Sequence, residues 1–527
     1  MLNSMMHTAL LVPAIMEHAA RQYPEQEIVC YGGGPPHRYT YREFSQRVRR
    51  LAGALQGLGV GRGDRVATLA WNTHEHLELY YAIAALGGIC HTINPRYSTE
   101  QMRYVVDHAD SRTLFFDASL TAIAGEILAA CTGLSTAVAI GGEAVEGDCL
   151  SYERFLASGE VMEEFPVLSE DDPCGLCYTS GTTGSPKGVC YTHRSTVLHA
   201  MSCLSREVLG LWSRDVVLAV VPMFHVNAWG LPYSALLAGA RLVLPGSDLS
   251  ASALHKIMEN ESVGFSAGVP TIWQDLIEYL DTHNKTFSTV KKVLVGGAAA
   301  PPKMFEDFAR HGASLIHGWG MTETTIGAIG NLPADLESLP EEEKNRLKAK
   351  QGRAPFGFEM KIVDEQGQKC AQDGVASGEL FVRGPWVVAN YLGTENEQAL
   401  KDDWFPTGDI ATLDARGYME IVDRKKDVIK SGGEWISSIA LENAVVKHPS
   451  VARAAVIGKP DHRWSERPLL IVVPADSCQP SVEELQEFLA DLFPRWWVPE
   501  EILFDTELPL GPTGKVLKTQ LRTKYLN

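Results

Sequence analysis

The sequence predicts an α/β protein: a large N-terminal domain of helix-covered sheets with a β-barrel-like part, followed by a small α+β C-terminal domain. Three observations favour this class. From about residue 63, β-rich runs alternate with helical patterns, which is typical of parallel sheets covered by helices. After residue 352, short strands and turns dominate. The length of 527 residues also exceeds what one core usually holds, so more than one domain is expected.

The first half of the chain predicts strands and helices in turn. Residues 1–20 predict a lead-in and an amphipathic helix. Strands are expected at 65–70 and 88–93, with a helix at 75–86 between them. The same pattern then recurs, with strands at 216–221, 241–244, 263–267, 292–295 and 314–317 and helices at 271–280 and 302–311.

The second half changes character. The charged stretch 333–350 predicts a solvated surface helix. The charge run Asp423-Arg-Lys-Lys-Asp427 lies between two apolar strands, and we expect the boundary between domains 1–422 and 428–527 there. Strands are expected at 359–363, 378–383 and 418–422 before this run, and a helix, two strands and a helix after it at 437–447, 452–458, 469–473 and 481–492.

Composition and charge exclude several classes of function. Hydrophobic residues make up 45% and charged residues 21%, which is typical of a soluble globular protein. The formal net charge of -18 and the pI of about 5.4 argue against a general nucleic-acid binder and a polybasic membrane anchor. The stretch 216–240 is long enough to span a membrane, but Pro222, His225, Asn227 and Pro232 interrupt it. We expect a buried strand, a loop and a helix there, and no stable membrane insertion.

Cysteine usage and the chain ends favour a cytoplasmic location. The ten Cys show no disulfide-framework spacing, which indicates a reducing compartment. The pair Cys174 and Cys177 is compatible with a redox or zinc site, but we expect two small apolar residues on a buried strand. Residues 1–20 lack a signal-peptide pattern, and the last residues are not a peroxisomal address.

The most informative segment is Tyr178-Thr-Ser-Gly-Thr-Thr-Gly-Ser-Pro-Lys-Gly188, which follows an apolar strand. Glycines permit close backbone approach to a ligand, and backbone amides, hydroxyls and a lysine suit phosphate oxygens. It differs from the common P-loop, because its lysine follows a proline rather than a glycine. A flexible polar turn is the alternative. The predicted phosphate-binding residues are Thr179, Ser180, Gly181, Thr182, Thr183, Gly184 and Lys187.

Further segments follow this loop in a fixed order. They are Gly296-Gly-Ala-Ala-Ala300, Gly318-Trp-Gly-Met-Thr-Glu-Thr324, Trp404-Phe-Pro-Thr-Gly-Asp409, the charge run with Ile429-Lys-Ser-Gly-Gly-Glu-Trp-Ile436, and Pro509-Leu-Gly-Pro-Thr-Gly-Lys-Val-Leu-Lys518. Together with the phosphate loop they resemble the adenylate-forming superfamily, which includes acyl-CoA synthetases, firefly luciferase and the adenylation domains of peptide synthetases. The resemblance spans nearly the whole chain. Within the superfamily, the chain is similar to bacterial medium- and long-chain fatty acyl-CoA synthetases and 3-(methylthio)propionate-CoA ligases.

The resemblance implies a nucleotide site. Thr322 would contact phosphate, and Glu323 and Thr183 would hold Mg²⁺, which prefers hard oxygen ligands. Asp409 would accept hydrogen bonds from both ribose hydroxyls, as a two-oxygen acceptor can. Arg424 would contact the nucleotide. The segments that would line the adenine and the rest of the nucleotide contain Gly297, Ala298, Ala299, Trp319, Gly320 and Met321.

The resemblance also implies a mobile C-terminal domain. Lys426 would be its hinge, and Lys430 with Gly432 and Gly433 would face the coenzyme A channel. Lys515 would be the catalytic lysine, with Lys518 as the alternative if the correspondence shifts by three residues. Leu510 replaces the usual basic residue of this tail, which departs from the family pattern.

An acyl pocket is expected at Pro222-Met-Phe-His-Val-Asn-Ala-Trp-Gly230. By resemblance, His225 would lie near the substrate carboxylate, and Trp229 matches an indole that gates the acyl tunnel of long-chain synthetases. A structural histidine and a core tryptophan are the alternatives. The predicted acyl-contacting residues are His225, Val226, Trp229, Gly230 and Gly320.

The resemblance implies an AMP-forming acyl-CoA synthetase that uses ATP, Mg²⁺ and coenzyme A, with Lys515, Glu323, Thr322 and His225 in catalysis. A medium- or long-chain fatty acid is the expected substrate, and a short apolar acid such as 3-(methylthio)propionate is the alternative. An adenylating enzyme with another acceptor, or a silent nucleotide-binding scaffold, also remains open. A homodimer is expected because related fatty acyl-CoA synthetases form dimers.

Overall fold

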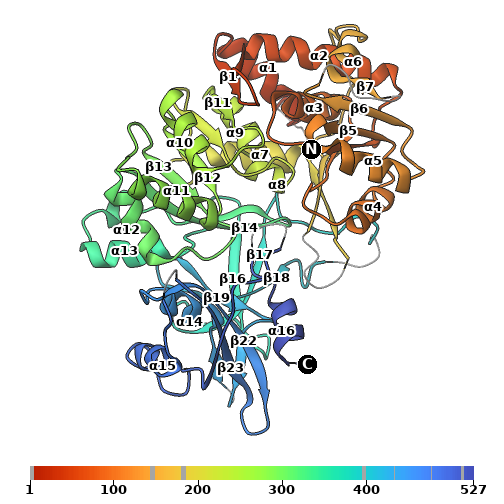
Figure 1. Ribbon diagram of the computed structural model, residues 1–527. Helices are drawn as coiled ribbons and strands as arrows, with labels where there is room; N and C mark the ends of the chain where they lie inside the picture. Colours follow the sequence, from red (N-terminus) through yellow and green to blue (C-terminus); the bar gives the residue numbers. More distant parts are fainter. Residues whose placement is uncertain are drawn as a thin grey trace. The chain divides into compact units, whose positions relative to one another are not determined.

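The computed structural model describes residues 5–142, 149–179, 185–394, 399–432, 434–475, 478–511 and 515–526. Helices and sheets are mixed throughout these ranges, so the predicted α/β class is confirmed (Figure 1). The chain forms two compact units. The first contains Met1–Glu359 and Arg383–Phe405, and the second contains Met360–Val382 and Pro406–Asn527.

The first unit is built on two mostly parallel sheets. In the eight-stranded sheet, β2 and β15 pair antiparallel at the two edges; its order is β15 (Thr325–Ile329), β14 (Ser314–Met321), β13 (Lys292–Val295), β12 (Phe265–Gly268), β10 (Val216–Ala219), β11 (Arg241–Leu244), β1 (Glu27–Cys30), β2 (His37–Thr40). In the seven-stranded sheet, only the edge strand β9 pairs antiparallel among the described residues; its order is β7 (Leu150–Ser151), β6 (Thr136–Ile140), β5 (Thr113–Asp117), β3 (Arg65–Leu69), β4 (Ile89–Thr92), β8 (Pro173–Tyr178), β9 (Gly188–Thr192).

Helices cover both faces of each sheet, because successive strand residues point to opposite faces. On β10, Val217 and Ala219 join the core shared by the two sheets, whereas Leu218 faces an outer core. The shared core is filled by α1 (Val12–Gln22), α2 (Tyr41–Gly57), α3 (His74–Ala85), α7 (His193–Cys203) and α9 (Leu231–Ala238). The outer cores contain α10 (Ala251–Asn260), α11 (Pro270–Thr282) and α12 (Pro302–Arg310) on one sheet, and α4 (Thr99–His108) and α5 (Thr121–Ala130) on the other.

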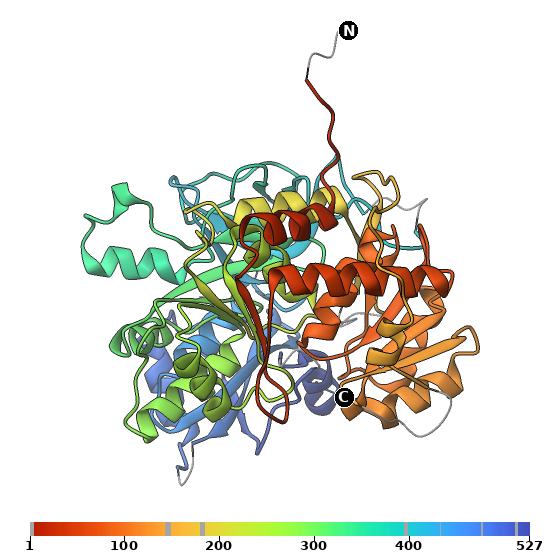
Figure 2. The same ribbon diagram turned by 90° about the horizontal axis from the view of Figure 1, so that it is seen from above.

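Local sequence signals explain several helix starts. Helix α2 begins with a capping box, in which the Thr40 side chain accepts from the Glu43 amide and the Glu43 carboxylate accepts from the Thr40 amide. Pro270 and Pro302 occupy the first turn of α11 and α12, where a missing amide proton costs nothing. Figure 2 shows α1 and α2 running side by side on this unit. Shorter helices of this unit include α6 (Tyr152–Ala157), α8 (Val226–Trp229) and α13 (Glu341–Ala349), the last lying in the stretch expected to form a charged surface helix.

The second unit contains two smaller sheets. The strand-rich part expected after residue 352 is a four-stranded sheet of β16 (Glu359–Val363), β17 (Ser377–Arg383), β18 (Phe405–Leu413) and β19 (Met419–Arg424). A five-stranded sheet follows, with β20 (Ile429–Ser431), β21 (Glu434–Ile436), β22 (Val451–Asp461), β23 (Ser465–Pro474) and β24 (Glu501–Phe504). Its faces pack on α14 (Ser438–Val445) and α15 (Val482–Ala490) on one side and α16 (Lys518–Leu526) on the other.

The structure differs from the sequence expectations mainly at boundaries. Strand β14 was expected to end at His317, but it continues to Met321 because Gly318 to Met321 pair antiparallel with β15. The compact units place β16 to β19 with the C-terminal part, so this division does not coincide with the charge run. The predicted domain limits and the hinge at 423–427 stay predictions.

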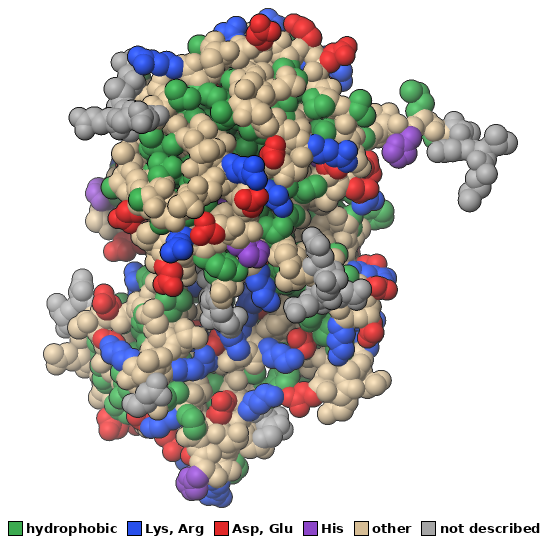
Figure 3. All heavy atoms as spheres, turned by 90° about the vertical axis from the view of Figure 1, so that its right-hand side faces the viewer, with side chains coloured by type: hydrophobic (Ala, Val, Ile, Leu, Met, Phe, Trp, Pro, Cys, Tyr) green, Lys and Arg blue, Asp and Glu red, His purple; other side chains and the backbone are tan. Residues whose placement is uncertain are grey.

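The charged surface, the helix lengths and the cysteines agree with what the composition predicts. Figure 3 shows acidic and basic side chains interspersed over the face in view. Across the described ranges, we find no helix that is both long and apolar enough to cross a bilayer. All ten Cys are free thiols, and Cys174 and Cys177 are buried on β8 as expected.

A buried ion pair between α2 and α3 provides a test of the fold. Glu78 is fully buried, accepts from Arg47 at 2.7 Å and from the Tyr152 hydroxyl at 2.7 Å, and burial raises the pKa of its carboxyl. Because Arg47→Met leaves this carboxylate without its cation, we expect the free energy of unfolding to fall by about 3 kcal/mol. Chemical denaturation followed by fluorescence measures this change.

The matched control lies on the same helix. Arg42 pairs with Glu25 at 2.7 Å, but both side chains are largely exposed, so Arg42→Met should change stability by less than about 0.5 kcal/mol. Equal effects of the two substitutions would contradict the role assigned to burial.

Candidate active site

The predicted site segments of the first unit lie at the carboxyl ends of three parallel strands of the eight-stranded sheet. Residues 220–230 follow β10, residues 296–300 follow β13, and residues 318–324 lie at the end of β14. In open α/β sheets, ligands bind in the crevice outside these strand ends. The phosphate loop similarly leaves the carboxyl end of β8 in the second sheet.

The base of the phosphate loop is closed by hydrogen bonds. The Thr179 amide donates to the Lys187 carbonyl oxygen at 2.9 Å, and the Lys187 amide donates to the Thr179 hydroxyl oxygen at 3.1 Å. The Tyr97 hydroxyl donates to the Thr179 carbonyl oxygen at 3.1 Å. The other predicted loop residues, Ser180, Gly181, Thr182, Thr183 and Gly184, lie outside the described residues.

The structure brings Lys187 and Glu323 to the same tyrosine. The Tyr391 hydroxyl donates to Glu323 Oε1 at 2.9 Å, and the Lys187 ammonium lies 4.7 Å from the centre of the Tyr391 ring. Burial and the charge of Glu323 raise the pKa of Tyr391, so its hydroxyl stays a neutral donor. Sequence reasoning missed Tyr391, because an isolated tyrosine in a loop carries no pattern.

Thr322 and Glu323 are held in a tight turn after β14. The Thr324 hydroxyl accepts from the Met321 amide at 3.0 Å, and the Tyr191 hydroxyl donates to the Thr322 carbonyl oxygen at 2.7 Å. A Cβ at Gly320 would lie 1.8 Å from the Thr325 carbonyl oxygen, so only glycine fits there. Glu323 fits the predicted Mg²⁺ site, because a buried hard carboxylate beside a phosphate loop is the usual protein contribution to such a site.

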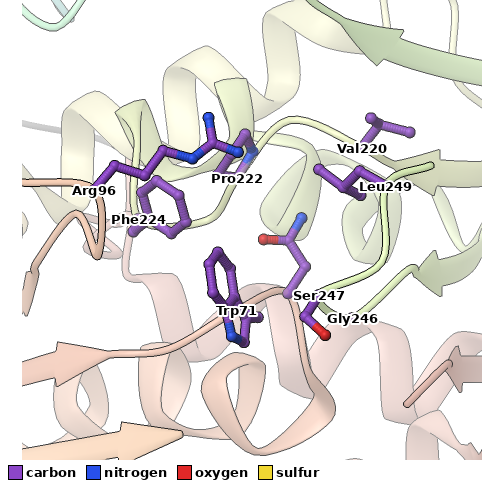
Figure 4. Close-up of a pocket in the computed structure, with 9 residues that line it drawn as sticks. Trp71, Arg96, Val220, Pro222, Phe224, Gly246, Ser247 and Leu249 are labelled. Atoms are coloured by element: carbon purple, nitrogen blue, oxygen red, sulfur yellow. The ribbon is translucent and has the colours of Figure 1, made fainter. Parts of the chain in front are cut away.

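The segment before the acyl region is anchored by Asn72. Its side-chain amide donates to the carbonyl oxygens of Ala219 and Val221 at 2.7 and 2.9 Å, and its oxygen accepts from the Met223 amide at 2.7 Å. Beside it lies a cavity of about 90 Å³, where the rings of Trp71 and Phe224 meet edge to face (Figure 4). Asn72 thus fixes the chain that leads to His225.

The acyl segment has an unusual backbone. Val226, Asn227, Ala228 and Trp229 all have positive φ, at 49°, 50°, 50° and 54°, and we call residues 226–229 the left-handed turn. Each such residue other than glycine or asparagine costs about 1–2 kcal/mol. Gly230 continues it with φ 77°, and a Cβ there would lie 2.6 Å from the His199 ring. The surrounding protein must therefore hold this turn in place.

The Trp229 indole, at the end of the left-handed turn, lies next to Gly296 and Gly297. A Cβ at Gly296 would approach the Trp229 indole to 3.2 Å and the Gly318 carbonyl oxygen to 2.8 Å, and a Cβ at Gly297 would approach the indole to 3.8 Å. Trp229 therefore lies beside the segment predicted to line the adenine, and His225, Val226 and Gly230 are near it in the chain. In residues 296–300, Ala298 is exposed and Ala299 is half-buried. In residues 318–324, Trp319 is buried, and Gly320 and Met321 are half-buried.

The predicted site residues of the second unit occupy β18 to β20. Asp409 is buried, and its Oδ1 lies 2.7 Å from Arg424 Nε across the β18–β19 pair. Lys430 pairs with Glu365 at 2.8 Å. Burial lowers the pKa of Lys426, the predicted hinge residue. The Gly432 amide donates to the Trp464 carbonyl oxygen at 2.9 Å, and Gly433 lies outside the described residues.

Burial distinguishes the two candidate lysines of the C-terminal tail. Lys515 is exposed, and its carbonyl oxygen accepts from the Gly511 amide at 2.7 Å. Lys518 is largely buried, 2.8 Å from Glu442, and its ammonium donates to the Ser438 hydroxyl. Burial lowers the pKa of Lys518, but the neighbouring Glu442 and Asp423 carboxylates raise it overall, so Lys518 stays charged. Lys518 is therefore engaged in contacts with Glu442 and Ser438 that stabilise the fold, and Lys515 stays the predicted catalytic lysine.

Comparisons with known proteins agree with the fold and with the sequence resemblance. A family model described as AMP-binding enzyme matches residues 16–392, and one described as AMP-binding enzyme C-terminal domain matches residues 440–515. The 3-methylmercaptopropionyl-CoA ligase of Ruegeria lacuscaerulensis is 45% identical, with 100% of this chain and 99% of that protein covered. The long-chain-fatty-acid–CoA ligase of Thermus thermophilus is 44% identical (100% and 97% covered), and the medium-chain-fatty-acid–CoA ligase of Ectopseudomonas oleovorans is 42% identical (100% and 98% covered).

Solved structures give the same result. The anthranilate CoA ligase AuaEII in complex with anthranoyl-AMP superposes with a TM-score of 0.88 at 25% identity, covering 99% of each chain. The o-succinylbenzoate CoA synthetase MenE from Bacillus subtilis, in complex with ATP and magnesium ion, gives a TM-score of 0.81 at 25% identity, covering 96% of this chain and 99% of that chain. The chain therefore belongs to the AMP-binding enzyme family and to its class of AMP-forming CoA ligases.

Proposed function

We propose that this enzyme joins an apolar carboxylic acid to coenzyme A through an acyl-adenylate, with MgATP as the energy source. The observation that carries the proposal is the meeting of Lys187 and Glu323 at Tyr391, within the fold of the AMP-binding family. The full-length relatives act on 3-methylmercaptopropionate and on medium- and long-chain fatty acids according to their names, which supports an apolar acid as substrate.

In the first step, a carboxylate oxygen attacks the α-phosphorus of ATP, an O–P bond forms, and the bond to pyrophosphate breaks. Both reactants are anions, so the barrier is largely electrostatic. Lys187 and the phosphate loop would hold the phosphates, and Thr322 would contact the α-phosphate. When bound at Glu323, Mg²⁺ would supply further positive charge. His225 would orient the carboxylate, and Asp409 and Arg424 would hold the ribose end of the nucleotide.

In the second step, the thiol of coenzyme A replaces AMP on the acyl carbon. We propose that the C-terminal domain rotates about Lys426 between the steps, which removes Lys515 and brings the segment of Lys430, Gly432 and Gly433 to the thiol. A few residues suffice to absorb such a change of dihedral angles. We also propose a homodimer in the cytoplasm; light scattering of the purified protein tests the dimer, and fractionation of cells tests the location.

The substrate and the acceptor can be tested together. Purified enzyme is incubated with MgATP, coenzyme A and straight-chain acids of increasing length plus 3-(methylthio)propionate, and thioesters are quantified by mass spectrometry. We expect thioesters of apolar acids only when coenzyme A is present. Acyl-adenylate that accumulates without any thioester would show a different acceptor. Failure to consume ATP with any acid would favour a silent nucleotide-binding protein.

The role of Lys515 predicts a split between the half-reactions. Lys515→Ala should lower the rate of adenylate formation by about 10²–10³-fold, because one charged donor to the transition state is lost. Thioester formation from supplied acyl-adenylate should stay within about threefold of the parent. Rapid-quench assays of each half-reaction measure both rates. Lys524→Ala, an exposed lysine of α16, is the control and should change neither. Equal losses of rate in both half-reactions would refute the assignment of Lys515 to adenylate formation alone.

The Tyr391–Glu323 contact predicts a change in the use of MgATP. Tyr391→Phe keeps the ring beside Lys187 but removes the donor to the carboxylate, and a hydrogen bond to a charged group contributes about 1.5–3 kcal/mol. We expect kcat/KM for ATP to fall about 10–100-fold, with a higher Mg²⁺ requirement, in pyrophosphate-exchange assays. The control is Tyr152→Phe, which removes a similar buried tyrosine–glutamate bond outside the site. An unchanged Mg²⁺ titration of Tyr391→Phe would speak against this role.

A further inference from the structure

The left-handed turn at residues 226–229 is not encoded by its own residues. Val226, Ala228 and Trp229 disfavour positive φ, and valine does so most strongly because of its branched Cβ. Only Asn227 tolerates this backbone. Such segments persist only where the surroundings hold them, and they cluster at ligand-binding sites. The buried contacts of Asn227 show what holds this one.

Asn227 ties the turn to two separate parts of the core. Its side-chain oxygen accepts from the Tyr80 hydroxyl at 3.3 Å and from the Cys177 thiol at 3.5 Å. Tyr80 lies on α3, and its single hydroxyl proton is shared between the Asn227 side-chain oxygen and the Met223 carbonyl oxygen. Cys177 lies on β8, two residues before Thr179 of the phosphate loop. The Asn227 side chain is buried, and a Cβ at Gly175 would lie 3.3 Å from its nitrogen.

We propose that Asn227 is a positioning residue for substrate choice: it holds the left-handed turn so that the indole of Trp229 stays against Gly296 and Gly297 and limits the space for the acyl chain. Trp229 follows Asn227 by two residues, and the Gly230 amide donates to the Asn227 carbonyl oxygen at 3.0 Å, which closes the turn. A shift of the turn therefore moves the indole. The inference rests on the proposed function, because the acyl group of that reaction is expected at residues 222–230.

The chemistry of the contact explains why selectivity, rather than the chemical step, depends on Asn227. The indole offers an apolar wall, and the Asn227 amide faces the core rather than a reacting atom. In an apolar pocket, one methylene changes selectivity by about 10–200-fold, so a small displacement of such a wall is sufficient to alter the preferred chain length.

Asn227→Gly tests the tether without adding backbone strain, because glycine adopts positive φ freely but lacks the side-chain hydrogen bonds. We expect KM for the preferred acid to rise about tenfold, and the ratio of kcat/KM between acids that differ by two methylenes to fall at least tenfold. KM for ATP should stay within about twofold. Asn284→Gly is the matched control, since Asn284 also has positive φ (51°) but is exposed after α11, and it should change none of these values.

Double variants and a spectroscopic readout separate the possible outcomes. If Asn227 acts through the indole, Trp229→Ala reproduces the altered selectivity and Asn227→Gly adds nothing to it. In protein labelled with 5-fluorotryptophan, the ¹⁹F resonance lost in Trp229→Phe should shift in Asn227→Gly and not in Asn284→Gly. This readout needs no turnover, so it tests the inference even if no acid is activated.

Two results would overturn the inference. One is an unchanged Trp229 resonance in Asn227→Gly. The other is a uniform loss of activity toward all acids together with a raised KM for ATP, which would make Asn227 a purely structural residue. Lack of acid activation by the parent enzyme would instead refute the proposed function.

Discussion

The contact that joins Lys187, Tyr391 and Glu323 organises the candidate active site. The Tyr391 ring lies beside the ammonium group of one segment while its hydroxyl donates to the carboxylate of another. Three parts of the chain that are distant in sequence therefore meet at one side chain. The tyrosine orients a cation suited to phosphate and a carboxylate suited to a metal ion, and we propose that these groups let two anionic reactants approach each other.

The sheets explain why these groups can meet. Parallel strands place their carboxyl ends at one edge, so the segments after β10, β13 and β14 converge without long connections. Close approach there depends on small residues. Gly296 and Gly320 have no room for a Cβ, because the backbone of a neighbouring segment lies within 3 Å of that position. The glycines of the motifs therefore have a packing role in addition to the ligand-binding role that we propose.

Sequence reasoning found the features that depend on residue type and failed where the signal is non-local. Lys187 and Glu323 were predicted because glycine, hydroxyl, lysine and carboxylate groups occur in an order that matches a known chemistry, and the structure brings both to Tyr391. Tyr391 was missed, since its role follows only from tertiary contacts. The left-handed turn was missed because valine, alanine and tryptophan carry no preference for it. Strand β14 was predicted too short, because its last residues, Gly318 to Met321, become a strand only by pairing with β15. Sequence also left Lys518 open as an alternative, and only burial separated it from Lys515.

We propose that the positive charge at the candidate site directs attack to the α-phosphorus of ATP. The most direct measurement is ³¹P NMR of the ATP products formed by purified enzyme with Mg²⁺, an apolar acid and coenzyme A. We expect AMP and pyrophosphate in equal amounts, formed only when the acid is present. Formation of ADP and inorganic phosphate, with no AMP, would contradict it.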